Sequence, residues 1–201
     1  MFPVGQADSR GRKEMMMLRW LCFLLISLPM ELLAILLAPV LPLFARPRYG
    51  PIDNGNAYGV EPRLPRWLDW FATPDNSLLG DEGHKARWRG RSQYLQMVAW
   101  LLRNRLYGFR WSVLAAPLER SAIHWSGNLN IRNRQHGVAG LLRVRMGGYW
   151  QYKRITPLWP GRCLQLNLGW IIDPFIKDPG KTGKAIYSTS VRLTAFFPDP
   201  S

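Results

Sequence analysis

Hydrophobic residues of this chain are concentrated in one segment near the N-terminus. Residues 20–45 read WLCFLLISLPMELLAILLAPVLPLFA, a run of 26 residues that is interrupted only by three prolines, Ser27 and Glu31. Crossing a bilayer takes about 20 apolar residues, so this run is longer than an ordinary buried helix requires. We therefore expect a transmembrane segment at residues 20–45, preceded by a basic N-terminal tail at residues 1–19.

Three topologies are compatible with this segment. One is a single span with a kink at Pro29, because proline removes a backbone donor. Another is a re-entrant hairpin that turns at residues 29–31 and keeps both ends cytoplasmic; Glu31 would be costly at the bilayer centre. The third is a cleaved secretory signal, but such signals have a core of about 7–15 apolar residues and a small-residue cleavage site. The first topology fits best.

The segments that follow differ in pattern. Residues 46–64 are rich in Pro, Gly and Asn and show no periodicity, which predicts a linker. Residues 64–71 carry apolar side chains at helical spacing, together with two tryptophans, and predict a short helix either at a membrane interface or against a sheet. Residues 92–106 predict a longer helix that Ser92 caps. Its apolar face consists of Tyr94, Met97, Val98, Leu101 and Leu102.

Beyond Gly108 the apolar period changes to two, which is typical of strands. We expect strands at residues 109–118, 140–146, 149–155, 162–170 and 185–197, with turns at residues 147–148 and 159–161. In the fourth strand the residues expected to face the core are Leu164, Leu166, Leu168 and Trp170, with Cys163, Gln165 and Asn167 on the solvent side. In the last strand they are Val191, Leu193, Ala195 and Phe197.

These elements predict an α+β protein. An N-terminal transmembrane or re-entrant helix precedes a domain at residues 65–201, in which one main helix packs on an antiparallel β-meander. The domain is basic, because 23 Lys and Arg outnumber 10 Asp and Glu from residue 46 onward. A net charge of +13 attracts anionic surfaces. Anionic lipid is the simplest partner next to a membrane anchor, and nucleic acid is the alternative.

Orientation follows from the same charges. Basic residues flank both sides of the apolar segment, and the more basic side is normally cytoplasmic. The true start is either Met1 or one of Met15, Met16 and Met17; a later start leaves only Arg19 before the segment. We therefore expect the C-terminal domain to be cytoplasmic and the protein to lie in an inner membrane.

Basic and aromatic residues alternate with core positions along the predicted meander. They form the candidate binding surface: Arg143, Arg145, Trp150, Tyr152, Lys153, Arg154 and Arg192. Such residues can contact lipid headgroups, a membrane protein, or nucleic-acid phosphates and bases.

No catalytic constellation is found in the sequence, and we expect no cofactor. Residues 75–84 contain weak metal-ligand candidates: Asp75, Asp81, Glu82 and His84. Their spacing does not match a calcium-binding EF-hand loop, and a turn-rich loop that offsets nearby cations explains them better. The GKTGK stretch at residues 180–184 resembles the end of a P-loop, but Phe175 stands where its first glycine belongs. An enzyme of unrecognised type that uses residues 75–84 is an alternative.

Two stretches resemble a family of uncharacterised small proteins encoded by tailed bacteriophages. They are VAWLLRNRLYGF at residues 98–109 and GRCLQLNLGW at residues 161–170, together with TPDN at residues 73–76 and Gly80-Asp81. The resemblance covers roughly residues 65–197 and implies a phage origin without any assigned chemistry. Combined with the anchor, it leads us to expect a non-enzymatic protein at the host inner membrane that binds a host or phage membrane component.

Overall fold

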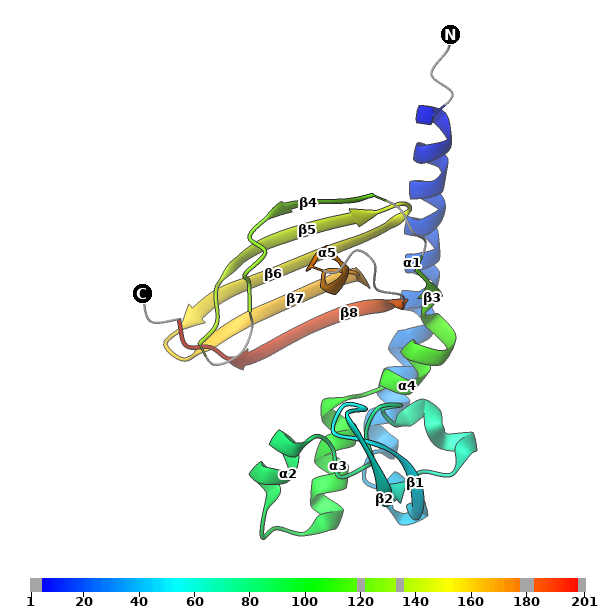
Figure 1. Cartoon of the computed structure of the whole chain (residues 1–201), viewed down its shortest axis with the longest axis vertical. Coiled ribbons are helices and arrows are strands. Elements are labelled where there is room, and N and C mark those ends of the chain that lie inside the picture. Colours follow the sequence, from blue (N-terminus) through cyan, green and yellow to red (C-terminus); the bar gives the residue numbers. More distant parts are fainter. Residues whose placement is uncertain (1–4, 119–121, 133–135, 178–182, 199–201) are drawn as a thin grey trace. The chain divides into compact units, whose positions relative to one another are not determined.

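The computed structural model describes residues 5–118, 122–132, 136–177 and 183–198 (Figure 1). The chain forms two compact units. Unit 1 contains residues up to 24 and from 115 onward, and unit 2 contains residues 25–114. Helix α1 (Gly5–Leu37) therefore contributes its first part to unit 1 and its second part to unit 2. These boundaries differ from the expected division into tail, span, linker and domain.

Helix α1 is continuous. It begins before the expected segment, passes through Pro29 and ends at Leu37, and the 3-10 helix η1 (Leu41–Phe44) follows. The re-entrant turn at residues 29–31 is therefore wrong. The helix continues there because its next turns are supported by packing: Ala34 and Ala38 are buried in the core of unit 2, with Met30 against them. Within the described residues α1 is the one helix long and apolar enough to cross a membrane, over Glu14–Leu37.

Unit 1 is built on an antiparallel sheet, which confirms the α+β class and the meander. In the described residues the sheet has six strands in the order β3-β8-β7-β6-β5-β4. Their bounds are β3 (Ala116–Pro117), β4 (Ile123–Gly127), β5 (Gly140–Met146), β6 (Tyr149–Trp159), β7 (Arg162–Ile171) and β8 (Lys184–Ala195). Helix α5 (Pro174–Lys177) contributes Phe175 to the core of this unit. The turns at residues 147–148 and 160–161 join β5 to β6 and β6 to β7, as predicted.

The expected strand at residues 109–118 is wrong over most of its length. The chain there forms α4 (Tyr107–Phe109) and the π-helix η3 (Arg110–Leu114), and only β3 is extended. The Ser112 hydroxyl donates to the Gly108 carbonyl oxygen at 2.6 Å, which supports the helical turn. Gly108 also packs its backbone closely against the Asp69 and Ala72 carbonyl groups, where a Cβ would not fit. Residues 107–114 are therefore helical because this turn packs closely, although their apolar residues alternate as in a strand.

The two faces of β7 are reversed relative to the prediction from Cys163 to Leu168, whereas Trp170 is buried as predicted. Cys163, Gln165 and Asn167 are buried, whereas Leu164 is 37% exposed. The cause is a hydrogen-bonded network that satisfies the polar side chains. Gln151 of β6 donates to the Asn167 side chain at 3.0 Å and accepts from the backbone N–H groups of Ile172 and Asp173. The expected core positions Val191 and Leu193 of β8 are likewise exposed, and so are Ala195 and Phe197.

Unit 2 contains a hairpin where a linker was expected. Strands β1 (Arg46–Ile52) and β2 (Ala57–Arg63) pair antiparallel through a turn in which Asp53, Asn54 and Gly55 adopt positive φ angles. The turn is held by the Gly55 N–H, which donates to the Asp75 carbonyl oxygen at 2.9 Å. Residues 46–64 are therefore part of a folded unit, and their prolines and glycines lie within strands at the edge of a two-stranded ribbon.

The helices of unit 2 are η2 (Arg66–Phe71), α2 (Glu82–Trp88) and α3 (Gln93–Arg103). Helix α3 confirms the predicted helix over Gln93–Arg103, although the Ser92 side chain makes no capping hydrogen bond. Its buried residues Met97 and Leu101 belong to a core with Leu41, Leu64 and Phe71, so α3 packs inside unit 2 rather than on the meander. The sheet of unit 1 is covered instead by the first part of α1 and by α5.

Candidate functional site

Four of the seven predicted surface residues meet around one cavity of unit 1. Arg143 and Arg145 of β5 lie opposite Tyr152 and Trp150 of β6, so all four share one face of the sheet. Together with Met17 of α1 they line a cavity of about 460 Å³. The predicted combination of arginine and aromatic side chains is therefore present at this place.

The other three residues lie apart from this cavity. Arg154 is exposed on the same face, further along β6. Lys153 points to the opposite face and forms an ion pair with Asp173 at 3.1 Å, so it belongs to the buried network. Arg192 is exposed and pairs in register with Gln165, on the face opposite Leu164.

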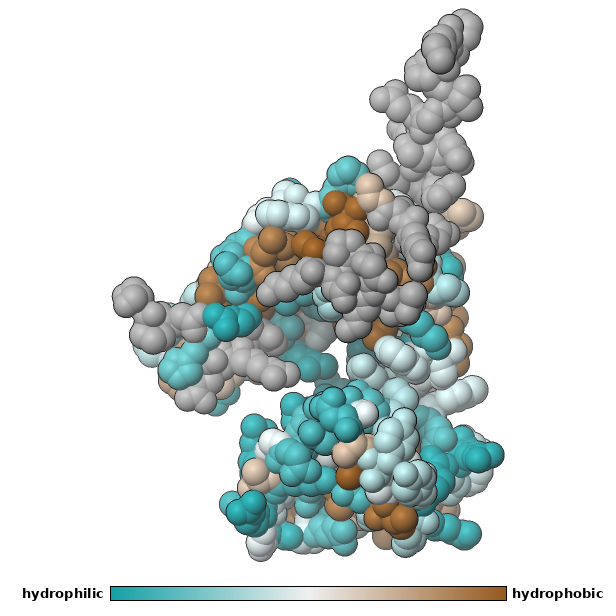
Figure 2. All heavy atoms as spheres, in the orientation of Figure 1, coloured by the Kyte–Doolittle hydropathy of each residue, from teal (hydrophilic) through white to brown (hydrophobic). Residues whose placement is uncertain are grey.

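The face that carries Arg143 and Arg154 is also apolar on the neighbouring strands. Leu164 and Leu166 of β7 pair with Leu193 and Val191 of β8, and Arg154 pairs with Leu166. Cross-strand partners share a face, so basic and aliphatic side chains lie side by side there. Figure 2 views unit 1 from the opposite side, on which α5 packs, and shows hydrophobic residues there, whereas hydrophilic residues predominate over the visible side of unit 2.

The first part of α1 packs on the end of this sheet. The Trp20 ring lies 5.4 Å from the Trp150 ring and also contacts Tyr187, and its indole N–H donates to the Ser188 carbonyl oxygen at 3.3 Å. Phe23 adds an edge contact with Tyr187. Tilted and edge-to-face aromatic contacts therefore hold one side of α1 against the sheet of unit 1.

The weak metal candidates serve the fold instead. Asp81 caps α2 by accepting from the His84 backbone N–H at 2.7 Å, and Glu82 pairs with Lys85. The His84 ring is buried and its Nε2 lies 3.0 Å from the Gln96 carbonyl oxygen. Across the described ranges, no three His, Cys, Asp or Glu side chains gather as a metal site would require.

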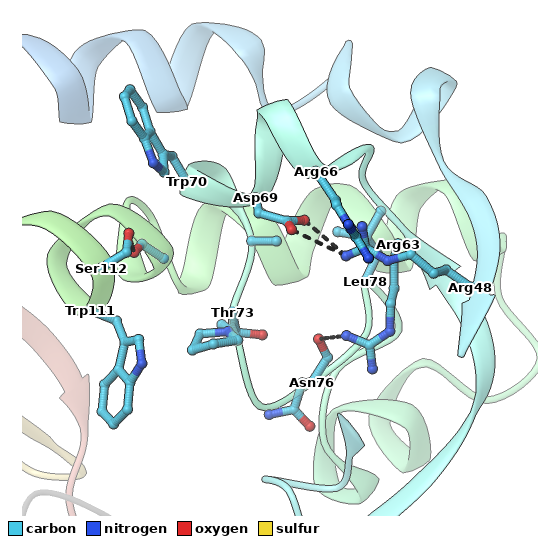
Figure 3. A pocket seen from close by; sticks show the side chains of 13 residues that line it. Arg48, Arg63, Arg66, Asp69, Trp70, Thr73, Asn76, Leu78, Trp111 and Ser112 are labelled. Carbon is cyan, nitrogen blue, oxygen red and sulfur yellow. Dashed lines mark hydrogen bonds and ion pairs between the residues drawn. The ribbon is translucent and has the colours of Figure 1, made fainter. Parts of the chain in front are cut away.

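A second cavity, which was not predicted, lies in unit 2 and has a volume of about 250 Å³. Figure 3 shows Arg48, Arg63 and Arg66 gathered with Asp69 on one side of it, opposite Trp70 and Trp111. The hairpin supplies Arg48 and Arg63, and η2 supplies Arg66 and Asp69. Three guanidinium groups and one carboxylate thus line the cavity. We call this cavity the arginine pocket.

Arg63 is the most constrained of the three arginines. Its side chain is buried, with 7% of the residue exposed, and it donates to the carbonyl oxygens of Asn76 and Pro51. Its Nε is buried without a hydrogen-bond partner. Burial, followed by the nearby charge of Arg48, lowers the pKa of Arg63 below its usual range. A buried cation with spare donors is suited to an anionic group.

The remaining two arginines differ in their partners. Arg48 makes two contacts to the Asp69 carboxylate, at 3.0 and 3.3 Å. Arg66 is exposed, and in the described part of the chain it has no carboxylate within ion-pair distance. The pocket therefore holds a formal charge of +2 when Asp69 is counted, which favours an oxyanion and offers no nucleophile paired with a base.

Exposed apolar side chains border the arginine pocket. Leu43 and Phe44 of η1 and Trp67 of η2 line a neighbouring cavity that shares Arg48 and Arg63. Leu43 is 72% exposed and Trp67 is 71% exposed, and the rings of Phe44 and Trp67 contact edge to face at 6.3 Å. The predicted short helix at residues 64–71 thus buries Leu68 and Phe71 but leaves its tryptophans facing outward.

Comparison with known proteins identifies a family but no individual relative. No curated protein and no solved structure matches the chain. A family model described as a family of unknown function (DUF7338) matches residues 12–193, and thus includes both cavities and most of α1. The chain therefore belongs to DUF7338, a family of unknown function.

Proposed function

We propose that the chain is a non-enzymatic, membrane-associated protein that binds a membrane component. The observation that carries the proposal is the exposed apolar side of α1. Leu25, Leu32 and Leu36 are between 59% and 73% exposed, although the opposite side of the same helix is packed. Leaving such a row of leucines in water is unfavourable by about 25 cal/mol per Å², so a lipid surface is its natural environment.

The packing of α1 favours binding along its length over crossing. Met16 and Trp20 pack on the sheet of unit 1, whereas Glu31 pairs with Arg110 inside unit 2. Within each unit one side of the helix is thus covered by protein, and the exposed leucines leave only the other side for lipid, as in a helix that lies along a membrane surface. We therefore assign α1 to the membrane surface, with its exposed leucines in contact with lipid.

The cellular setting of this proposal comes from the sequence. The phage origin rests on the resemblance, and the host inner membrane with a cytoplasmic C-terminal domain rests on the apolar segment and the basic charge. In that setting the protein would exclude a later phage, modify the envelope or assist lysis by binding a host or phage membrane protein. Anionic lipid would help to hold the basic surface at the membrane.

Vesicle flotation tests the role of the exposed leucines. The full-length protein should float with phosphatidylcholine vesicles. The triple variant Leu25→Ser, Leu32→Ser, Leu36→Ser should lose at least tenfold in partitioning, because three leucines that would insert into lipid are removed. Val60→Ser is the matched control, since Val60 is exposed but lies on β2. Unchanged flotation of the triple variant would contradict the proposal.

Reporter fusions test the topology. Alkaline phosphatase, which is active only after export, is fused before Met1 or after Ser201 in cells expressing the full chain. Both fusions should stay inactive if α1 binds along the cytoplasmic surface. A helix that crosses once would place one end outside, so activity of one fusion would overturn the surface assignment.

A further inference from the structure

The arginine pocket has more positive charge than the fold uses. Asp69 neutralises Arg48, but neither Arg63 nor Arg66 has a carboxylate within ion-pair distance in the part of the chain that the structure describes. Burying an unpaired cation is costly, so a protein that retains one normally satisfies it with a ligand or another charge. The excess positive charge and the buried guanidinium of Arg63 therefore suit the pocket to an anion.

The backbone is shaped to place the guanidinium of Arg63. Gly50 of β1 lies against it: a Cβ at position 50 would approach Nε to 2.7 Å and Cζ to 2.8 Å. Carbonyl oxygens of Asn76 and Pro51 accept hydrogen bonds from the two terminal nitrogens of Arg63. Two of the five N–H groups of the guanidinium donate to these carbonyl oxygens, and the buried Nε–H has no hydrogen-bond partner. Arg63 is thus held in place before any ligand binds.

We propose that Arg48, Arg63 and Arg66 bind the phosphate group of a phosphomonoester. The formal charge of +2 matches a dianion, and guanidinium forks match the oxygens of phosphate in bidentate geometry. The cavity of about 250 Å³ has room for such a group and the first atoms attached to it. Trp70 and Trp111 on the opposite wall offer flat apolar surfaces to the remainder of the ligand.

Two kinds of ligand carry a phosphomonoester group: a lipid with such a headgroup and a soluble phosphomonoester. The bordering residues Leu43, Phe44 and Trp67 are of the kinds that settle at the boundary between headgroups and acyl chains. Their position next to the pocket favours the lipid, and this choice of source rests on the proposed membrane association. The phosphate site itself does not depend on it.

Calorimetry and vesicle binding separate the two sources. Full-length protein in detergent is titrated with glycerol 3-phosphate and with inorganic phosphate. The same protein is then offered phosphatidylcholine vesicles that contain either phosphatidic acid or phosphatidylglycerol at matched surface charge. We expect heat with the soluble phosphates and tighter binding to phosphatidic acid. A heat of binding with the soluble phosphates, without a preference between the two kinds of vesicle, supports the phosphate site and assigns it to a soluble ligand.

Two pairs of variants identify the pocket as the place of binding. Arg66→Gln should weaken phosphate binding at least about tenfold, as loss of a charge-assisted contact does, whereas Arg89→Gln removes an equally exposed charge elsewhere in unit 2 and should change it little. Gly50→Ala keeps every charge but displaces Arg63 and should weaken binding similarly. Its control is Gly59→Ala, the cross-strand partner, where a Cβ meets only the tip of Ile52 at 3.3 Å.

The outcomes are distinguishable from those of the membrane proposal. The phosphate site is overturned if neither soluble phosphate gives a heat of binding and the protein binds both anionic vesicles equally. This holds even if the protein binds vesicles. Equal losses for Arg66→Gln and Arg89→Gln also overturn it, because they would show a general charge effect. Failure of the membrane proposal instead appears as no binding to phosphatidylcholine vesicles, with the heat of phosphate binding retained.

Discussion

The buried amide of Gln151 decides which face of the sheet is the core. Its side chain makes four hydrogen bonds: it donates to Asn167 and Asp173 and accepts from the backbone N–H groups of Ile172 and Asp173. Gln151→Leu keeps the size but removes all four. A buried polar group left without a partner costs about 1–3 kcal/mol. The Ile172 N–H and the Asn167 oxygen are buried, and Asp173 is partly exposed, so we expect a loss of roughly 2–5 kcal/mol.

Urea unfolding of the full-length protein in mild detergent, followed by circular dichroism, measures this loss through the transition midpoint. Leu164→Gln on the opposite face of β7 is the matched comparison. Because Leu164 is 37% exposed, its replacement should cost no more than about 1 kcal/mol. If Leu164→Gln proved more costly than Gln151→Leu, the leucines would face the core and the reasoning would be refuted.

Two further predictions concern unit 2. Glu31→Leu removes the carboxylate that pairs with the mostly buried Arg110 and should destabilise the protein by about 1–3 kcal/mol in thermal unfolding, whereas the double variant Glu31→Leu, Arg110→Leu should recover most of the loss. A double variant as unstable as the single one would contradict the pairing. Burial, opposed by the hydrogen bond to Gln96, lowers the pKa of His84 below 6.5, so the unfolded chain takes up a proton that the folded one does not. Stability should therefore fall as the pH drops below about 6.5, and His84→Gln should remove that part of the pH dependence in urea midpoints measured from pH 5 to 8.

The meander was predictable because its hairpins are marked by glycine turns and its strands alternate. Which face of β7 is buried was not predictable, because an alternation of Leu with Gln and Asn is consistent with either face being buried. Hydrophobicity alone selects the leucines. The structure buries the polar residues because Gln151, Ser188 and Thr194 provide partners for them across the sheet. Those partners are distant in sequence, so no local pattern reports them.

The arginine pocket was missed for a different reason. Its arginines lie in or next to residues 46–64, which were interpreted as a linker because of their Pro and Gly content. A signal was nevertheless present: Asn54-Gly55 between two extended stretches is a strong hairpin turn. With the hairpin in place, Arg48 and Arg63 come from paired strands and meet η2. The helix at residues 92–106 was predictable in itself, but its partner was not, because another helix and not the sheet covers it.

The first part of α1 is synthesised long before the last strand of the sheet against which it packs. The hydrogen bond from Trp20 to Ser188 joins residues 168 positions apart. At about 5–20 residues per second, a ribosome needs roughly 10–30 s to make the strand that Trp20 contacts. During that interval the apolar helix has emerged while β8 does not yet exist. If the proposed membrane association holds, such a nascent chain reaches a membrane or a targeting factor first, and its sheet then closes onto a helix that is already at the lipid surface.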